Sequence, residues 1–259
     1  MAITPGNAKS SEFLVVDDVR LEIRAWPGQG MSILLLHEGL GSVAMWRDFP
    51  ERLAAATGHP VIAWSRRGYG LSDPLRESRD PDYMHGEAQF VAPLLDALAL
   101  ERAVLFGHSD GGSIALIAAA RIPDRVAALV LEAPHVYVER LTVDSIATTK
   151  SLYATTDLRA RLQRYHRDPD HVFWRWNDIW LDPRFRDWSI DDLLPAIRAP
   201  ALLIQGRDDE YGTIDQIDRI AAVLKVTQRL ELPSCGHSPH RDQPQAVLAA
   251  TSAFLETLQ

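Results

Sequence analysis

A short polar stretch, GHSDG at 107–111, carries the residue types that a serine nucleophile requires. It follows the apolar run 103–106 and precedes the small-residue run 113–120. In the pattern G-x-S-x-G, the serine stands on a tight turn between a strand and a helix, and glycines leave room for the strained backbone. Such a turn lifts the Ser109 hydroxyl out of the sheet and directs the backbone N–H of Asp110 at a developing oxyanion. The stretch therefore predicts a nucleophile elbow.

A serine hydroxyl is a weak nucleophile alone, so it needs a base, and the base needs a carboxylate that orients it. The sequence supplies both downstream, each after a predicted strand. Asp208 and Asp209 follow the apolar run 201–206, and His237 follows the run 229–233. Because His237 comes directly after a glycine that ends a strand, its imidazole can reach across to the serine. The pattern predicts a Ser-His-Asp triad.

Two choices within this triad are made on residue type and position. We expect Asp209 to orient the base and Asp208 to cap the turn. We expect His237 to be the base, with His240 as its rival. A metal site built on these two histidines lacks an accompanying ligand cluster, so neither a metal nor a cofactor is predicted. A second oxyanion donor is expected from the backbone N–H of Gly39, in the loop after the first buried run.

These residues depend on a sheet that brings strand ends together. Alternating apolar and polar residues in 13–26 predict an opening antiparallel hairpin. Continuous apolar runs, which are typical of strands buried on both faces, then recur along the chain. The runs span 32–37, 61–64, 103–106, 126–133, 201–206 and 229–233, and helical patterns span 46–57, 87–100, 111–121, 215–224 and 244–258. This alternation predicts an α/β fold with a mostly parallel central sheet flanked by helices.

One interval, 135–198, contains no strand-like run and differs in composition. Four of the seven tryptophans lie in it: Trp174, Trp176, Trp180 and Trp188. Structureless loops beyond roughly 15 residues are uncommon, so we expect a helical cap inserted into a core formed by 1–134 and 199–259. The first three of these tryptophans are interpreted as a roof over the substrate, with packing of the cap onto the core as the alternative.

Composition limits the class of protein. The chain has 259 residues, 46% of them hydrophobic, which suffices for one well-cored domain. Its net charge of -8, without any Lys/Arg-rich block, argues against nucleic acid and anionic membranes as partners. The single cysteine, Cys235, excludes an intrachain disulfide. No signal peptide and no apolar run of about 18 residues stand out, so we expect a soluble cytoplasmic protein.

Together the motifs resemble the α/β-hydrolase fold superfamily. The matching stretches are LLLHEGLGS at 34–42, SRRGYGLSDP at 65–74, GHSDGG at 107–112, QGRDDEYG at 205–212 and CGHSPHRDQP at 235–244. The run 107–126 looks most like the biphenyl hydrolase-like serine esterases, the group of valacyclovir hydrolase, and GRDD is similar to the meta-cleavage-product C–C hydrolases. The resemblance implies a helical cap and these roles: nucleophile Ser109, acid Asp209, base His237, and oxyanion donors Gly39 and Asp110.

Two positions depart from that resemblance. The family usually has His-Gly where this chain has His37-Glu38. A carboxylate at this place would oppose a developing negative charge unless it is paired or turned away. The second departure is Ser65, at the start of SRRGYG, where the family usually has an aspartate-containing run. Nothing in the sequence explains this second change.

Glu38 and Asp110 place two carboxylates near the nucleophile. In the biphenyl hydrolase-like group, the aspartate that corresponds to Asp110 is thought to receive a substrate ammonium. The two acids are therefore interpreted as favouring esters that carry a cationic amine, such as aminoacyl esters. The alternative is structural: the helix N-terminus stabilises Asp110, and an arginine pairs with Glu38.

The function predicted from these residues is hydrolysis of a small carboxylic ester through an acyl-enzyme on Ser109. Two alternatives are kept. One is hydrolysis of a C–C bond in a ring-fission product, and the other is a non-catalytic ligand-binding member of the fold. The predicted partner is a small ester or acyl compound, and a homodimer is left open.

Overall fold

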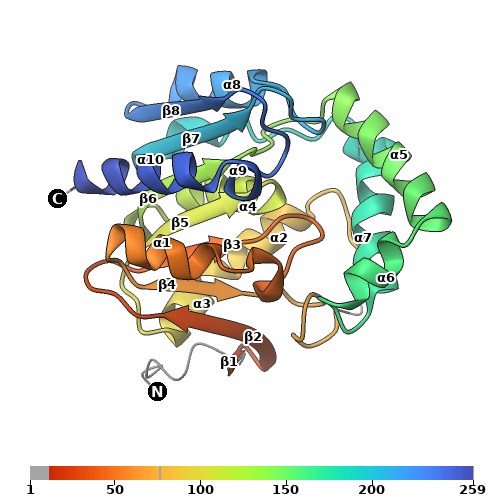
Figure 1. Ribbon diagram of the computed structural model, residues 1–259, viewed down its shortest axis with the longest axis horizontal. Helices are drawn as coiled ribbons and strands as arrows, with labels where there is room; N and C mark the ends of the chain where they lie inside the picture. The colour runs from red at the N-terminus through yellow and green to blue at the C-terminus, as the bar shows by residue number, and fades with distance from the viewer. Residues whose placement is uncertain (1–11, 76, 259) are drawn as a thin grey trace.

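The computed structural model describes residues 12–75 and 77–258, which build one eight-stranded sheet (Figure 1). The strands are β1 (Glu12–Val16), β2 (Val19–Trp26), β3 (Ile33–Leu36), β4 (Val61–Trp64), β5 (Ala103–His108), β6 (Val126–Glu132), β7 (Ala201–Gly206) and β8 (Thr227–Leu232). Their order in the sheet is β1-β2-β4-β3-β5-β6-β7-β8. The pairs from β4 to β8 are parallel, and β2 is antiparallel to both of its neighbours. The predicted opening hairpin and mostly parallel sheet are confirmed.

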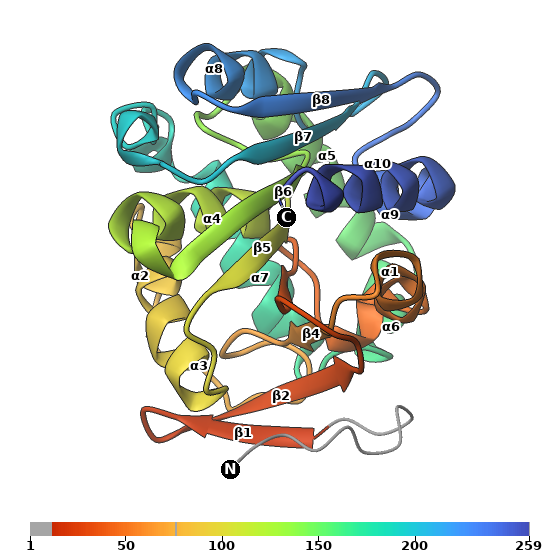
Figure 2. The same ribbon diagram turned by 90° about the vertical axis from the view of Figure 1, so that its left-hand side faces the viewer.

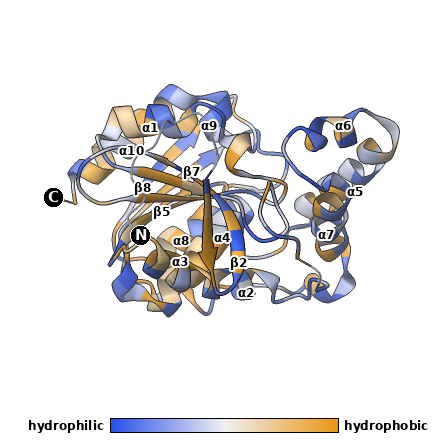
Figure 3. Cartoon of the chain, turned by 90° about the horizontal axis from the view of Figure 1, so that it is seen from below, coloured by the Kyte–Doolittle hydropathy of each residue, from blue (hydrophilic) through white to orange (hydrophobic). Residues whose placement is uncertain are grey.

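Helices cover both faces of the sheet (Figure 2). The core helices are α1 (Phe49–Thr57), α2 (Tyr83–Gln89), α3 (Val91–Ala97), α4 (Asp110–Arg121), α8 (Asp215–Val223), α9 (Pro239–Asp242) and α10 (Pro244–Glu256). The first buried cluster includes residues of α2, α3, α4 and α8, and the second includes residues of α1 and α10. Seen from below, hydrophobic residues run through the middle of the sheet and hydrophilic residues lie on the flanking helices (Figure 3). Burial on both faces explains the continuous apolar runs.

The predicted helix at 87–100 is wrong in its limits, because the chain forms two helices there. It starts earlier, with α2 at Tyr83, and breaks at Phe90 before α3 begins. Pro93 explains the break, since proline has no N–H to donate and its ring clashes with the carbonyl four residues earlier, that of Gln89. The predicted helix at 46–57 is likewise divided, into the short 3-10 helix η1 (Val43–Trp46) and α1.

A helical layer stands at the carboxyl ends of the parallel strands, on the right of Figure 1. It consists of α5 (Arg140–Thr155), α6 (Leu158–Gln163) and α7 (Pro169–Leu181). Tyr137 and Ser189 pair as an isolated antiparallel bridge, so the chain enters and leaves this layer at neighbouring points. The cap boundaries at 135 and 198 stay a prediction. Within the described residues, no helix has the length and apolar character needed to span a membrane.

At two glycines, the turn from β5 into α4 is packed too closely for a side chain. A Cβ added at Gly111 would lie 2.0 Å from the carbonyl oxygen of Leu36, the last residue of β3. A Cβ added at Gly107 would lie 2.4 Å from the carbonyl oxygen of Gly111. Both obstacles are backbone atoms, which cannot move aside as a side chain can. The glycines of the elbow therefore allow the helix to start directly against the sheet.

We predict that Gly111→Ala lowers the free energy of unfolding by roughly 1–3 kcal/mol or more, because the new methyl overlaps the β3 backbone. Gly86→Ala is the matched control. Gly86 also lies in a helix, but its Cβ would meet nothing within 4 Å, so alanine there should stabilise by roughly 0.5–1 kcal/mol. Urea denaturation of the two variants measures both effects. Equal stability of the two variants would contradict this account of the elbow.

Candidate active site

Ser109 stands on the turn between β5 and α4 in a strained conformation. Its φ is 54° and its ψ is -121°, a region that residues with a side chain rarely adopt. Its backbone N–H donates to the carbonyl of Glu132 at 2.9 Å, which ties the turn to the end of β6. Its carbonyl accepts from Gly112 at 2.8 Å. The strained turn thus holds the hydroxyl above the carboxyl edge of the sheet, as the sequence pattern predicts.

Three predicted side chains meet in one hydrogen-bonded chain. Nε2 of His237 lies 2.9 Å from Oγ of Ser109, and Nδ1 of the same ring lies 2.9 Å from both carboxylate oxygens of Asp209. The neighbouring Asp208 is exposed and takes no part in the chain. His240, the rival base, instead bonds Glu132. Of the alternatives weighed in the sequence, the structure places His237 beside the serine and Asp209 beside His237.

The Asp209 carboxylate is held by more than the histidine. Its oxygens accept from the backbone N–H of Tyr211 at 2.7 Å and of Gly212 at 3.1 Å, and from Nε2 of Gln205 at 2.7 Å. Burial alone would raise the pKa of Asp209, but the nearby His237 and the hydrogen bonds from His237 and from the backbone N–H of Tyr211 outweigh it, so that pKa lies below its usual value. The carboxylate is therefore charged and fixed in direction.

The imidazole carries the opposite shift. Burial alone would lower the pKa of His237, but the charge of Asp209 and the hydrogen bond to it raise that pKa above its usual value. The charges of Glu210 and Glu38 act in the same direction. This His237 ring is thus prepared to accept a proton from Ser109, because its protonated form has a charged partner.

Two backbone N–H groups lie free beside the serine. Among the described residues, neither Gly39 nor Asp110 donates its N–H to any acceptor. The Gly39 N–H belongs to the same peptide group as the Glu38 carbonyl. That carbonyl is already hydrogen-bonded, because it accepts from Nδ1 of His37 at 2.7 Å and from Arg66 at 2.9 Å. In a trans peptide the N–H points away from the C=O. These bonds therefore direct the Gly39 N–H away from His37 and Arg66.

A cavity of about 160 Å³ lies over the serine. Both predicted oxyanion donors, Gly39 and Asp110, line it, and so do His237 and two tryptophans, Trp176 and Trp180. Trp176 packs so closely on the loop that a Cβ at Gly39 would lie 2.3 Å from its indole. The lining contains carboxylates but, among the described residues, neither lysine nor arginine. The site can hold a small molecule beside a hydrogen-bonded serine.

Comparison with known proteins identifies the family. A model of the alpha/beta hydrolase family matches residues 33–251. This chain belongs to the alpha/beta hydrolase family. The human serine hydrolase BPHL is 28% identical over 247 residues, which cover 91% of this hydrolase and 82% of that protein. The 2-hydroxy-6-oxo-6-phenylhexa-2,4-dienoate hydrolase of Burkholderia cepacia is 24% identical over 259 residues, covering 88% of each chain.

Solved structures agree on the fold. The meta-cleavage product hydrolase CumD from Pseudomonas fluorescens has a TM-score of 0.76 to this hydrolase, at 21% identity, and covers 96% of this chain and 98% of its own. At this identity the likeness shows the fold alone. The predicted α/β-hydrolase fold and the resemblance to BPHL-type and C–C hydrolases are confirmed.

Glu38, the first departure from the family, has its carboxylate hydrogen-bonded within the loop after β3. One carboxylate oxygen accepts from the backbone N–H of Leu40 at 2.7 Å. No arginine pairs with this carboxylate among the described residues, since Arg66 bonds the Glu38 carbonyl instead. Glu38 is half-buried and still lines the cavity. The carboxylate thus adds negative charge to the cavity while the oxyanion donor next to it stays free.

Asp110 also lines the cavity, but its carboxylate is buried. The hydroxyl of Tyr83 donates to this carboxylate at 2.7 Å, and the guanidinium of Arg66 lies 4.0 Å from the same oxygen. The side chains of Arg66 and Asp110 are 0% and 1% exposed. The second carboxylate oxygen is buried and has no hydrogen-bond partner among the described residues. Asp110 is therefore half of a buried ion pair.

Of the three tryptophans interpreted as a roof, two lie over the serine. Trp176 and Trp180 are four residues apart on α7 and so share one face of the helix. Trp174 is not part of the cavity lining; it is 36% exposed, and Nζ of Lys150 lies 5.7 Å from its ring. A separation of two residues along a helix corresponds to a rotation of about 200° about its axis, so Trp174 lies on the opposite side of the helix from Trp176.

Ser65, the second departure, has a structural explanation. Its hydroxyl donates to the carboxylate of the buried Glu22 at 2.7 Å and accepts from the N–H of Val43 at 2.9 Å. The same carboxylate oxygen accepts from Leu71 at 2.9 Å. A carboxylate is thus present in this turn, but β2 supplies it rather than the turn itself. Serine bridges this carboxylate and the loop after β3.

A cluster of two histidines and a glutamate lies behind the elbow. Nδ1 of the buried His240 bonds the Glu132 carboxylate at 2.7 Å, and Nε2 of His108 donates to the carbonyl of His237 at 2.6 Å. One potential ligand atom each from His108, Glu132 and His240 lies within 4.8 Å of the others, so these residues could hold a metal ion. The hydrogen bonds already tie the His237 loop to the ends of β5 and β6.

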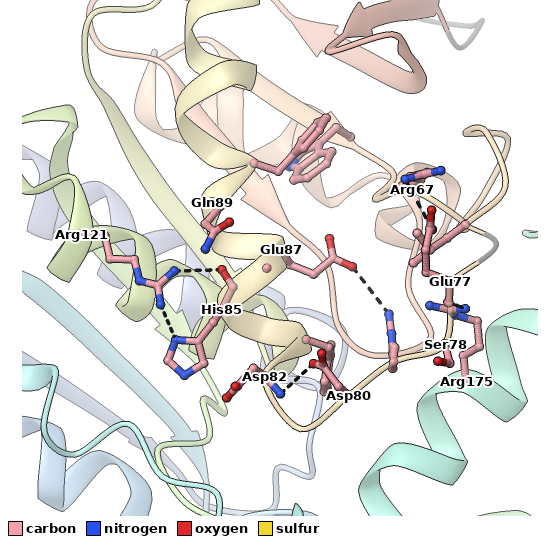
Figure 4. A pocket seen from close by; sticks show the side chains of 16 residues that line it. Arg67, Glu77, Ser78, Asp80, Asp82, His85, Glu87, Gln89, Arg121 and Arg175 are labelled. Atoms are coloured by element: carbon pink, nitrogen blue, oxygen red, sulfur yellow. Dashed lines mark hydrogen bonds and ion pairs between the residues drawn. The ribbon is translucent and has the colours of Figure 1, made fainter.

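A larger hollow, of about 660 Å³, lies around α2 and away from the triad (Figure 4). Four of its charged side chains form two ion pairs: Arg79 lies 3.8 Å from Glu87, and Arg67 lies 3.6 Å from Glu77. Ser78 also lines it, but among the described residues no hydrogen bond joins the Ser78 hydroxyl to a base. The smaller cavity is the candidate active site, because the hydrogen-bonded serine lies there.

Sequence reasoning missed residues that reach the site from loops. His135, Glu210 and Tyr211 line the cavity, and Tyr83 holds the Asp110 carboxylate from α2. Tyr83 lies outside the predicted helix and 27 positions before Asp110, so nothing local in the sequence connects the two residues. His135 had a signal: it follows the predicted strand 126–133, at the same sheet edge where the triad was expected.

We predict that Arg66→Met lowers the free energy of unfolding by roughly 3–5 kcal/mol, because the Asp110 charge would stay buried without its partner. The double variant with Asp110→Asn should recover part of the loss. Arg67→Met is the matched control, since Arg67 pairs with Glu77 at the surface and should change stability by less than about 1 kcal/mol. Urea denaturation measures all three. The buried pair is unimportant if Arg66→Met and Arg67→Met unfold alike.

Proposed function

We propose that this hydrolase cleaves a small carboxylic ester through an acyl-enzyme formed on Ser109. The observation that carries the proposal is the chain of contacts at 2.9 Å from Ser109 through His237 to Asp209. A serine bonded to an imidazole that is itself oriented by a buried carboxylate is the arrangement that activates a hydroxyl for acyl transfer. Free N–H groups beside the hydroxyl support the same chemistry.

Each step of ester hydrolysis has a group placed for it. Nε2 of His237 takes the proton as Oγ of Ser109 attacks the carbonyl carbon, and Asp209 keeps the other ring nitrogen protonated. The N–H groups of Gly39 and Asp110 receive the negative charge on the carbonyl oxygen. His237 then gives its proton to the departing alcohol. Water, activated by the same ring, releases the acid and restores the serine.

Cavity size and charge support a small substrate without a carboxylate. Sites for drug-sized ligands are typically about 300–1,000 Å³, and this one is about 160 Å³. Glu38 and Glu210 line it, and among the described residues no lysine or arginine does. A substrate carboxylate would therefore meet like charge and no cationic partner. An uncharged or cationic ester fits this field better.

The sequence suggested that Glu38 and Asp110 attract an amine-bearing ester, but the structure favours Glu38 and Glu210 for this role. Arg66 already pairs with the Asp110 carboxylate, which is 1% exposed: one of its oxygens accepts from Tyr83, and the other is buried without a partner among the described residues. Asp110 is therefore less accessible to a substrate than the half-buried Glu38 and the exposed Glu210. Glu38 and Glu210 are the carboxylates that remain to attract an ammonium group. We therefore assign any preference for aminoacyl esters to Glu38 and Glu210 rather than to Asp110.

Hydrolysis of a C–C bond is the second candidate, since a relative at 24% identity is a dienoate hydrolase. The aromatic wall formed by Trp176 and Trp180 suits it, but the acidic lining opposes a dienoate carboxylate. A third candidate, a binding protein with an unused triad, requires that Ser109 be unreactive. Reactivity of the serine and charge of the substrate separate the three.

We predict that a fluorophosphonate labels the protein covalently and that Ser109→Ala abolishes the labelling, because only an activated hydroxyl displaces fluoride. Ser113→Ala is the control: this hydroxyl is buried against the backbone of His135 and should not react. Labelling is read by mass spectrometry. A folded protein that takes up no label would favour the non-catalytic alternative.

Rates of hydrolysis of matched substrates by the native protein and by Ser109→Ala test the substrate class. We expect hydrolysis of neutral and cationic 4-nitrophenyl esters by the native enzyme, a weaker rate on an ester with an acyl carboxylate, and loss of all three in Ser109→Ala. A ring-fission dienoate serves as the C–C substrate. Faster turnover of the dienoate than of every ester would overturn the ester proposal.

We predict that kcat/KM for an ester rises with pH through an inflection above about 6.5, because the base acts as neutral imidazole and its pKa is raised. Asp209→Asn removes the charge that raises this pKa, so the inflection should move to lower pH. The rate should also fall, by roughly 10⁴-fold, as in a serine protease with this change. Asp208→Asn, at the exposed neighbour, should leave the profile in place. An unmoved inflection in Asp209→Asn would show that Asp209 does not set it.

A further inference from the structure

One polar side chain in the cavity has no role in the steps above. His135 follows β6, lines the same cavity as Ser109, and is 2% exposed. Its ring centre lies 5.8 Å from that of His237. Nδ1 is buried without a partner, and among the described residues Nε2 has none either. Buried polar groups are nearly always hydrogen-bonded, so the buried and unpaired Nδ1 requires an explanation.

The ring is held in place by the structure around it. The hydroxyl of Ser113 donates to the backbone carbonyl of His135 at 2.6 Å and accepts from its N–H at 3.1 Å. Trp180 packs edge-on against the imidazole, with ring centres 5.1 Å apart. A Cβ at Gly212 would lie 3.4 Å from Cε1 of the ring. A position fixed in this way is typical of a group that meets a ligand without rearranging.

The ring is also uncharged. Burial first, and the nearby His237 second, lower the pKa of His135 to about 4. A neutral imidazole has one N–H donor and one lone-pair acceptor, so it suits a hydroxyl, a ketone or an amide. It has no charge with which to attract a carboxylate, and the acids that would attract an ammonium stand elsewhere in the lining, at Glu38 and Glu210.

We infer that His135 binds an uncharged polar group on the acyl part of the substrate, which makes the preferred substrate a hydroxy-, keto- or amido-acyl ester. The inference rests on the proposed ester hydrolysis and specifies its substrate class. The acyl side is chosen because the acyl group stays bound to Ser109 after the alcohol departs. A buried residue beside the serine is therefore placed to contact the group that remains.

The experiment compares matched pairs of 4-nitrophenyl esters. Each pair has an alkyl acyl group and one of similar length that carries a hydroxyl, a ketone or an amide. The measured quantity is the selectivity, defined as kcat/KM for the polar ester divided by kcat/KM for its alkyl partner. In the native enzyme we expect a selectivity above one for at least one pair. In His135→Leu that selectivity should fall by about tenfold or more, because the leucine cannot form the hydrogen bond.

Two further variants separate recognition from general damage. His135→Asn keeps an amide that donates and accepts, so it should retain more of the selectivity than His135→Leu does. Ile146→Val, which changes the volume of the same cavity but no polar group, should change both esters of a pair alike. Circular dichroism checks that each variant is folded.

The outcomes distinguish this inference from the proposed function. If the native enzyme hydrolyses the esters but shows no preference for any polar acyl group, His135 does not have this role. The same holds if His135→Leu keeps the selectivity of the native enzyme within about twofold. A native enzyme that hydrolyses none of the esters overturns ester hydrolysis itself, and the role of His135 with it.

Discussion

The active-site geometry depends on one strained residue. Ser109 keeps a φ of 54° because its N–H is tied to Glu132 at the end of β6, and because Gly111 lets α4 begin directly against β3. The hydroxyl is thereby fixed relative to three neighbouring strand ends. Asp209 and His237 follow β7 and β8, so their contacts with the serine form only while the parallel strands keep their register. The sheet is the part of the fold that aligns the triad.

Much of this arrangement can be predicted from the sequence, because its causes are local. A strand covered on both faces must be apolar throughout, so the runs in β3 to β7 mark the sheet directly. A turn without space for a Cβ must contain glycine, and so GHSDG marks the elbow. The choice of Asp209 over Asp208 is less local, since it depends on which carboxylate faces the sheet edge and which faces solvent.

The remaining features depend on contacts that no local pattern encodes. Helix phase relative to the core decides that Trp176 faces the serine while Trp174 faces solvent. Arg66, in the loop after β4, pairs with Asp110 at the start of α4, far away in the sequence. Each residue, taken alone in the sequence, is of a type that usually lies at the surface. The break before α3 could have been predicted from Pro93 in the sequence. The prediction of one continuous helix instead followed the helical periodicity of 87–100.

Acidic residues surround the serine, although the proposed reaction requires stabilisation of an oxyanion. The buried guanidinium of Arg66 resolves this conflict. The Glu38 carbonyl accepts from Arg66 at 2.9 Å, from His37 at 2.7 Å and from the N–H of Gly41 at 3.0 Å. Hydrogen bonds to one end of a peptide polarise the other end, so these donors strengthen the Gly39 N–H as a donor. Arg66 is completely buried, and so its charge acts through the peptide rather than by contact with solvent or substrate. In the proposed reaction, the site would therefore stabilise negative charge on the reacting oxygen. Its cavity, whose lining contains carboxylates but no lysine or arginine among the described residues, would still disfavour an anionic substrate.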